Sequence, residues 1–178
     1  MNPINALLLQ IKKGKKQAMQ DLYEQTRRGV FAFILPYLHD TQLTEDVMQD
    51  TYLKVMDNIH QYQLTTNGMN WILTIARNTA LNLIKVRDRE TQVERETLEA
   101  TLPSSLDIYD LGSPVITLAK KILDLEEQKI LFLYAISEYK HREIALIMNI
   151  PIGTVTWKYN QAIKKMKGAL KKWTKKIC

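Results

Sequence analysis

The feature that most constrains the fold of this chain is its final segment, residues 141–178, which has the pattern of two short amphipathic helices joined by a tight turn. Ala145, Asn149 and Val155 occupy the fifth, ninth and fifteenth positions of a helix-turn-helix frame. That frame needs a small residue where the helices cross, a left-handed turn residue, and an apolar anchor on the second helix. Asn is the best substitute for glycine at the turn. Eight lysines and no acid follow from Lys158 onward, so the segment predicts a helix that binds DNA.

The charge of the chain is distributed in three blocks. Residues 1–87 carry ten Lys/Arg against seven Asp/Glu, residues 88–114 two against seven, and residues 115–178 thirteen against five. Two basic blocks around an acidic segment predict two domains that face nucleic acid, joined by a linker. A merely solvated basic surface is the alternative. The 178 residues have room for one ordinary domain or two small ones.

Helical periodicity predicts an all-α fold of two small helical domains joined by an irregular linker. Residues 43–59 place apolar side chains at i+4 spacing, and residues 70–87 form a second helical face. Residues 89–114 are acidic, break the periodicity and contain Pro103, Gly112 and Pro114. We therefore expect domains over 1–88 and 115–178, with 89–114 as the linker. Its apolar residues, such as Leu106 and Ile108, predict that part of the linker lies against a domain or a partner.

The sequence offers no arrangement typical of an enzyme. His39, His60 and His141 are isolated from one another, and none has the spacing of metal ligands. No phosphate-binding glycine loop and no nucleophile elbow is present, so we expect no catalysis, no metal and no cofactor. The single cysteine, Cys178, excludes an intramolecular disulfide, and no stretch approaches the roughly 20 apolar residues that span a bilayer. These observations predict a cytoplasmic protein with no membrane insertion of its own.

Two polar faces lie opposite the predicted apolar stripes. Asp46, Gln49 and Asp50 share one helix face, on which Asp50 can also pair with Lys54. A solvated helix surface explains these residues equally well. On the next helix, amides and cations recur at helical spacing: Asn78, Asn82, Lys85 and Arg89, flanked by Arg77 and Arg87. Amides can read base edges and cations can hold phosphates, although cations are also favoured near any helix C-terminus.

The second helix of the helix-turn-helix has a buried side and a polar side. Val155, Tyr159, Ala162, Met166, Leu170 and Trp173 have the spacing of the buried side. At 100° per residue, the opposite side centres on Trp157, Gln161 and Lys164, with Thr154, Lys158 and Lys165 at its edges. A helix that enters the major groove by its N-terminus would present Thr154, Trp157, Lys158 and Gln161 to bases, and Lys164, Lys165, Lys171 and Lys172 to phosphates. Trp157 either contacts thymine methyl groups or folds down onto the protein.

These segments together resemble the extracytoplasmic-function (ECF) class of bacterial sigma factors, over roughly residues 15–90 and 115–173. LTEDVMQDTYLKV is similar to the acidic motif of sigma region 2, and NWILTIARNTALNLIK to its A-W-L-x-x-I-A-R-N segment. REIALIMNIPIGTVTWKYNQAIKKMK is similar to region 4, typically E-I-A-x-x-L-G-I-P-x-G-T-V-K-S-R. The chain departs from these patterns at Asn82, where Asp is common, at Asn149, where Gly is usual, and at Thr156-Trp157-Lys158, where Lys-Ser-Arg is usual. The last departure concerns promoter specificity and leaves the fold unaffected.

The resemblance implies partners for each polar face. Region 2 of such proteins binds the clamp helices of the RNA polymerase β′ subunit, a role that falls here on Asp46, Gln49 and Asp50. Region 2 also binds the promoter's minus-ten element, through a loop matching Gln63 to Asn70 and the helix after it. The residues that would bind that element are Asn67, Asn70, Arg77, Asn78, Asn82, Lys85 and Arg87. Region 4 contacts the β flap and reads the minus-thirty-five element. The residues that would do so are Arg142, Thr154, Thr156, Trp157, Lys158, Gln161, Lys164 and Lys165.

The resemblance further implies a transcription initiation factor that helps to open promoter DNA and is held inactive by an anti-sigma factor. A stand-alone helix-turn-helix regulator would explain the C-terminal half equally well. It would leave the two polar faces of the N-terminal half without a role. An adaptor that binds acidic proteins is a third possibility, and absence of salt-sensitive DNA binding would favour it.

Overall fold

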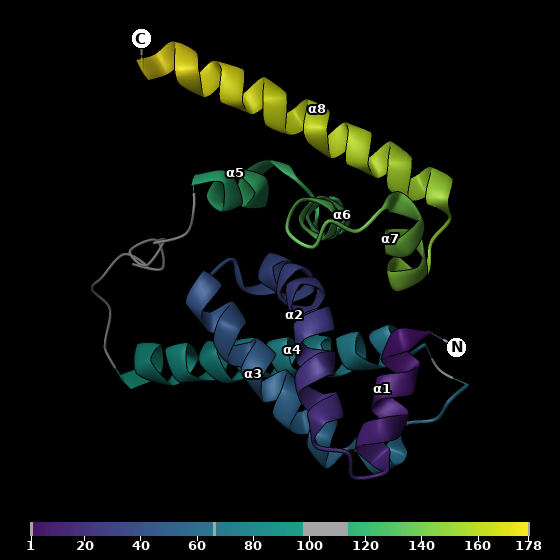
Figure 1. The fold of residues 1–178 in the computed structure, drawn as a ribbon. Coiled ribbons are helices and arrows are strands. Elements are labelled where there is room, and N and C mark those ends of the chain that lie inside the picture. The colour runs from purple at the N-terminus through teal and green to yellow at the C-terminus, as the bar shows by residue number, and fades with distance from the viewer. Residues whose placement is uncertain (1, 66, 98–113, 178) are drawn as a thin grey trace.

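The fold is described by a computed structural model covering residues 2–65, 67–97 and 114–177, with side chains through Arg89 in α4 and Lys171 in α8 (Figure 1). The first half contains α1 (Pro3–Lys12), α2 (Gln17–Leu38), α3 (Thr41–Asp57), the short 3₁₀ helix η1 (Ile59–Gln61) and α4 (Gly68–Thr97). The second half contains α5 (Pro114–Ile122), α6 (Leu125–Ala135), α7 (His141–Met148) and α8 (Ile152–Ile177). Every regular element in these ranges is a helix, which confirms the predicted all-α fold.

The first half is a bundle in which α2, α3 and α4 pack against one another. The stripe predicted on residues 43–59 is confirmed, since Val47, Thr51 and Val55 are buried. A tight turn follows α2. His39 adopts a left-handed conformation, φ 55°, and ends α2, and the Asp40 side chain then accepts a 2.9 Å hydrogen bond from the Leu43 N–H at the start of α3. Such a cap satisfies a backbone donor that the helix itself leaves unpaired.

Helix α4 runs further than the charge pattern predicts. It continues to Thr97, nine residues past the expected boundary at residue 88. The acidic composition that suggested a linker is compatible with a helix, because Glu and Arg are good helix formers. Residues 98–113, including Leu106 and Ile108, lie outside the described residues, and so does the predicted contact between the linker and a domain.

The second half contains the predicted helix-turn-helix. Asn149 ends α7 at φ 53°, the left-handed conformation that the frame requires. Val155, Ala162 and Met166 are buried on the inner side of α8, which packs along α6 and α7. The predicted buried side is therefore confirmed at Val155, Ala162 and Met166, whereas Tyr159 is half-buried and Leu170 is 38% exposed; the Trp173 side chain lies outside the described residues. No described helix is both long enough and apolar enough to cross a membrane.

Helix α6 joins the two halves, because it packs against α2 on one side and α8 on the other (Figure 1). Gln128 Oε1 lies 2.8 Å from His39 Nε2, and Lys129 Nζ lies 4.4 Å from the centre of the Tyr37 ring. Gly29 permits a further close approach, since a Cβ atom there would lie only 2.6 Å from the Tyr139 hydroxyl. The two helical units are thus docked face to face.

Candidate nucleic-acid and polymerase interface

The polar face of α3 points away from the bundle. Asp46, Gln49 and Asp50 are all exposed on the side opposite the buried stripe. The prediction that Asp50 pairs with Lys54 is wrong. Lys54 Nζ instead donates a 3.1 Å hydrogen bond to the Thr79 hydroxyl of α4. The acidic face is therefore open to a partner, and Lys54 braces α3 against α4.

The predicted minus-ten residues of α4 also form an exposed face. Arg77, Asn78 and Asn82 are exposed along its middle, and Lys85 and Arg87 follow one to two turns later. The opposite side carries Ile72, Ala76 and Ala80, all buried in the bundle. Asn78, Asn82 and Lys85 thus share the solvent side of the helix, and this combination of amides and a cation is suited to nucleic acid.

The two asparagines before that face have structural roles in this conformation. The Asn67 side chain accepts hydrogen bonds from the backbone N–H groups of Met69, at 3.0 Å, and Asn70, at 3.3 Å, at the start of α4. The Asn70 amide donates to the Leu146 carbonyl oxygen of α7, across the interface between the two halves, at 3.3 Å. Its Oδ1 atom is buried without a hydrogen-bond partner. The sequence predicted both residues as DNA ligands, and the docking of α7 explains why Asn70 faces the protein here.

A shallow pocket of about 320 Å³ adjoins the α4 face and was not predicted from the sequence. Its walls combine the expected Asn78 and Asn82 with Lys54, Asn58 and Gln61 from the end of α3 and from η1. Half-buried Trp71 contributes an aromatic wall, and an aromatic ring among amides suits an unpaired base. The polar residues at the end of α3 did not predict this pocket from the sequence. The pocket forms only because the fold brings the end of α3 and η1 next to α4.

The N-terminal half of α8 presents part of the predicted reading surface. The Trp157 side chain is 61% exposed, so the alternative in which it folds down onto the protein is wrong for this structure. Thr154 and Gln161 are partly exposed nearby, and Arg142 is exposed on α7. Thr156, by contrast, is turned inward: its hydroxyl donates to the Ile152 carbonyl at 3.0 Å and lies 3.1 Å from His141 Nδ1.

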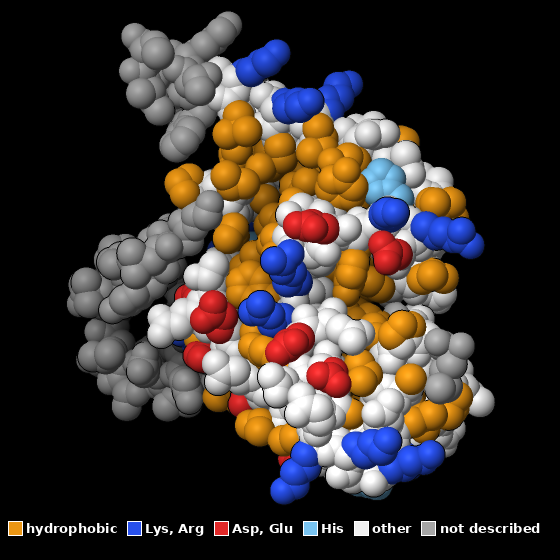
Figure 2. Space-filling model, in the orientation of Figure 1, with side chains coloured by type: hydrophobic (Ala, Val, Ile, Leu, Met, Phe, Trp, Pro, Cys, Tyr) orange, Lys and Arg blue, Asp and Glu red, His pale blue; other side chains and the backbone are white. Residues whose placement is uncertain are grey.

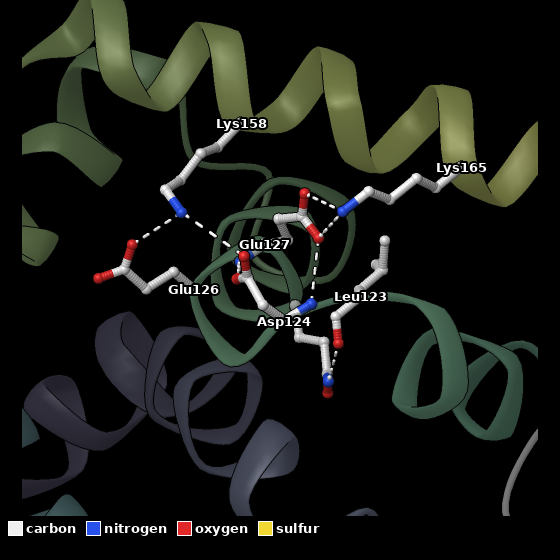
Figure 3. Close-up of polar contacts among 7 residues, drawn as sticks. Leu123, Asp124, Glu126, Glu127, Lys158 and Lys165 are labelled. Carbon is white, nitrogen blue, oxygen red and sulfur yellow. Dashed lines mark hydrogen bonds and ion pairs between the residues drawn. The ribbon is translucent and has the colours of Figure 1, made fainter.

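Two lysines predicted to contact DNA are held by the protein itself (Figure 3). Lys158 Nζ lies 2.9 Å from Glu126 and 3.6 Å from Asp124, and its side chain is only 18% exposed. The hydrogen bond with Glu126 raises the pKa of Lys158 above its ordinary value. Lys165 Nζ lies 2.6 and 2.7 Å from the two carboxylate oxygens of Glu127, a side chain that is 5% exposed.

Lys158 and Lys165 contact these acids because of where they lie around the axis of α8. Lys158 and Lys165 are seven residues apart and sit on the edge of α8 that faces the N-terminus of α6. The acids there also cap α6, since Asp124 and Glu127 form a reciprocal capping box. Lys158 and Lys165 therefore fix α8 on α6. Lys164, one residue from Lys165, is exposed on the outer side.

Family models identify both halves of the chain. The model described as sigma-70 region 2 matches residues 22–90, and the model described as sigma-70 region 4 matches residues 117–166. Together the two matches cover more than half of the chain and occur in the order that the sequence pattern predicted. The chain belongs to the sigma-70 family, in its ECF class. Region 2 thus spans most of α2 to α4, and region 4 spans α5 to the middle of α8.

Curated relatives are named as RNA polymerase sigma factors. The chain is 23% identical to "ECF RNA polymerase sigma factor SigW" of Bacillus subtilis, with 85% of this chain and 88% of that protein aligned. It is 25% identical to "Probable RNA polymerase sigma-C factor" of Mycobacterium bovis, with 85% and 83% aligned. Both alignments extend across regions 2 and 4.

Solved structures share the fold. The chain resembles CnrH, solved in complex with the cytosolic domain of CnrY, with a TM-score of 0.64 at 17% identity over 96% of this chain and 98% of that one. It resembles RpoE of Bartonella quintana, solved with the anti-sigma factor NepR, with a TM-score of 0.59 at 22% identity over 88% and 98%.

Proposed function

We propose that this chain is an alternative sigma factor that binds core RNA polymerase, recognises two promoter elements and promotes strand opening. Its role would be that of an initiation factor without catalysis of its own. One observation carries the proposal: regions 2 and 4 match in the family's order, and the helices of each carry exposed polar faces on α3, α4 and α8. Domains over 1–88 and 115–178 and a cytoplasmic location remain part of the proposal.

The exposed α3 face is assigned to core polymerase. Asp46, Gln49 and Asp50 offer carboxylate and amide oxygens on one surface, which suits a partner that presents cations or hydrogen-bond donors. The β flap is assigned to region 4. Asp46, Gln49 and Asp50 are exposed and do not pack in the core of the bundle. Substitutions at these positions should therefore change polymerase binding without changing folding.

Simultaneous contact with both promoter elements requires the docked halves to separate. The element names imply centres about 25 base pairs apart, which is about 85 Å of duplex at 3.4 Å per step. In this structure the Asn70 amide at the start of α4 lies 3.3 Å from the Leu146 carbonyl, close to the start of α8. We therefore propose that core polymerase holds the two regions apart, so that each raises the effective concentration of the other on DNA.

An anti-sigma factor is proposed as the regulatory partner. The class resemblance supports this assignment, and CnrH and RpoE were each solved with a protein partner, in the second case one named as an anti-sigma factor. Such a partner would cover the faces that polymerase and promoter use.

The test compares core binding, DNA binding and initiation. The Gln49→Ala/Asp50→Ala variant should assemble less holoenzyme with bacterial core polymerase and initiate less from promoter templates, with unchanged binding of the isolated chain to DNA. Glu24→Ala, another exposed acidic residue of region 2, serves as the matched control and should behave like the wild type. Footprinting with and without core polymerase separates the proposal from a stand-alone regulator. A footprint that does not need core polymerase would favour the regulator.

A further inference from the structure

Helix α1 lies outside the part of the chain that the region 2 model matches, which begins at residue 22. It packs against η1 and α4, the helices on either side of the loop that the proposed function assigns to the minus-ten element (Figure 1). The described residues of this promoter loop are Gln63, Leu64, Thr65 and Asn67. We propose that α1 is a brace, which uses Asn5 and Lys12 to hold both ends of the promoter loop ready to capture an unpaired base.

Lys12 holds the end of the loop that follows η1. Its Nζ atom donates a 2.8 Å hydrogen bond to the carbonyl oxygen of Tyr62, the residue before the loop. The Tyr62 side chain is only 1% exposed, and its ring centre lies 5.2 Å from that of Trp71. Trp71 is the aromatic wall of the pocket beside α4. Because a hydrogen bond from a charged donor is stronger than a neutral one, Lys12 fixes the loop end and, through Tyr62, that wall.

Asn5 holds the other end of the loop, where α4 begins. Its Oδ1 atom accepts a 2.8 Å hydrogen bond from the Gly68 N–H. The Asn67 side chain accepts from the next two N–H groups, those of Met69 and Asn70. The first N–H groups of a helix have no partner within the helix itself. Asn5 therefore completes the cap of α4 from a different helix and ties the loop end to α1.

The contact between α1 and this loop end is unusually close. A Cβ atom on Gly68 would lie 2.8 Å from Asn5 Oδ1 and 2.8 Å from Leu8 Cδ1, so the approach requires glycine there. Asn5, Leu8 and Lys12 are three and four residues apart and thus share one side of α1. Leu8 is fully buried. From Asn5 to Lys12 the helix axis spans about 10.5 Å, so one side of α1 extends across both ends of the loop.

The loop gains order from its ends because its own side chains do not enter the core. Gln63, Leu64 and Thr65 are all exposed. A loop that is already ordered loses less conformational entropy when it binds a ligand. Fixing both ends should therefore raise the affinity of the loop for an unpaired base and favour strand opening.

A neighbouring lysine provides a matched control for Lys12. Figure 2 shows Lys and Arg side chains gathered at the end of the bundle where Figure 1 places the turn between α1 and α2. Lys13, Lys15 and Lys16 are exposed in this turn. Lys13→Met removes the same charge as Lys12→Met from almost the same place, but it leaves the hydrogen bond to Tyr62 intact.

The inference rests on the proposed function, because it assumes that the promoter loop binds promoter DNA. Holoenzyme is assembled from the full chain and bacterial core polymerase on a template selected from a random library by wild-type transcription. Permanganate reactivity of unpaired thymines then measures strand opening. Asn5→Ala and Lys12→Met should each lower the ratio of open to closed template about fivefold, the loss of one net hydrogen bond. Lys13→Met, Asn5→Asp, which keeps the acceptor, and Lys12→Arg, which keeps a donor, should behave like the wild type.

A third variant reaches the same contact from the α4 side. Gly68→Ala places a methyl group against Asn5 and Leu8, so it should displace α1 and reduce strand opening to a similar extent. A template whose minus-ten element is already mismatched needs no unpairing energy, so initiation by all three defective variants should come within about twofold of the wild type on it. Holoenzyme assembly should be unchanged, because the exposed α3 face is not altered.

The possible results separate the brace from the proposed function. Equal strand opening by the wild type, Asn5→Ala, Lys12→Met and Gly68→Ala would overturn the brace alone. Weaker holoenzyme assembly, or a defect of the same size on the mismatched template, would also overturn it, because α1 would then act on polymerase binding or on folding in general. A wild-type chain that directs no initiation from any template would overturn the proposed function itself.

Discussion

The ion pair between Lys165 and Glu127 should stabilise region 4 far more than its surface position on α8 suggests. Lys165→Met leaves the Glu127 carboxylate 5% exposed and retains only one hydrogen bond for it, from the Asp124 N–H at 3.0 Å. Removing one partner of a buried pair costs about 3–5 kcal/mol. Lys165 is itself 44% exposed and the Asp124 donor remains, so we expect the lower end, about 3 kcal/mol.

The assay is urea unfolding of the full chain followed by circular dichroism. Lys164→Met is the matched control, because Lys164 is adjacent and exposed, and it should change the free energy of unfolding by less than about 0.5 kcal/mol. Glu127→Gln in the Lys165→Met background removes the buried charge and keeps an acceptor for Asp124, so it should restore most of the loss. High salt should reduce the difference only in part, because Lys165 is 44% exposed whereas Glu127 is 5% exposed. Equal stability of Lys165→Met and Lys164→Met would refute the reasoning.

Three other perturbations follow from single contacts. Burial raises the pKa of Tyr52 above its ordinary value of 10.0, so the tyrosine ionises at lower pH in the unfolded chain than in the folded one. The folded state therefore loses stability as the pH rises past about 10. Tyr52→Phe should make that loss shallower in unfolding experiments at alkaline pH. Asn149→Ala should cost about 1 kcal/mol because of its positive φ, whereas Asn149→Gly should cost nothing, as measured by thermal unfolding. Lys129→Ala removes the cation that contacts the Phe33 and Tyr37 rings across the interface between the halves. The halves should then separate more often, which increases the radius of gyration in small-angle scattering. An unchanged radius would show that this contact does not hold the halves together.

Local features of the fold were predictable because they depend on residues close in sequence. The turn at Asn149 follows from the helix-turn-helix spacing and from the tolerance of Asn for positive φ. The buried side of α8 follows from periodicity, and so do the stripes of α3 and α4. The end of α4 was missed, because an acidic segment rich in helix formers has no signal that stops a helix at residue 88.

The assignment of individual lysines was not predictable in the same way. Lys158 and Lys165 occupy the edge of a polar face, and sequence alone treats them like Lys164. Their partners Asp124, Glu126 and Glu127 precede them by more than 30 residues, and only the packing of α6 along α8 brings them within 3.6 Å. Asn70 is a similar case, since its partner Leu146 belongs to the other half of the chain.

The sequence by itself determined the helices, the two-region order and the membership of the family, because periodicity, caps and motif spacing are properties of neighbouring residues. Tertiary structure alone decided which charges remain available to a partner and which are used to hold helices together. The physical reason is that a charged side chain pairs with whatever opposite charge the fold brings within a few ångströms. That proximity is set by how α6 lies between α2 and α8, which no local pattern encodes.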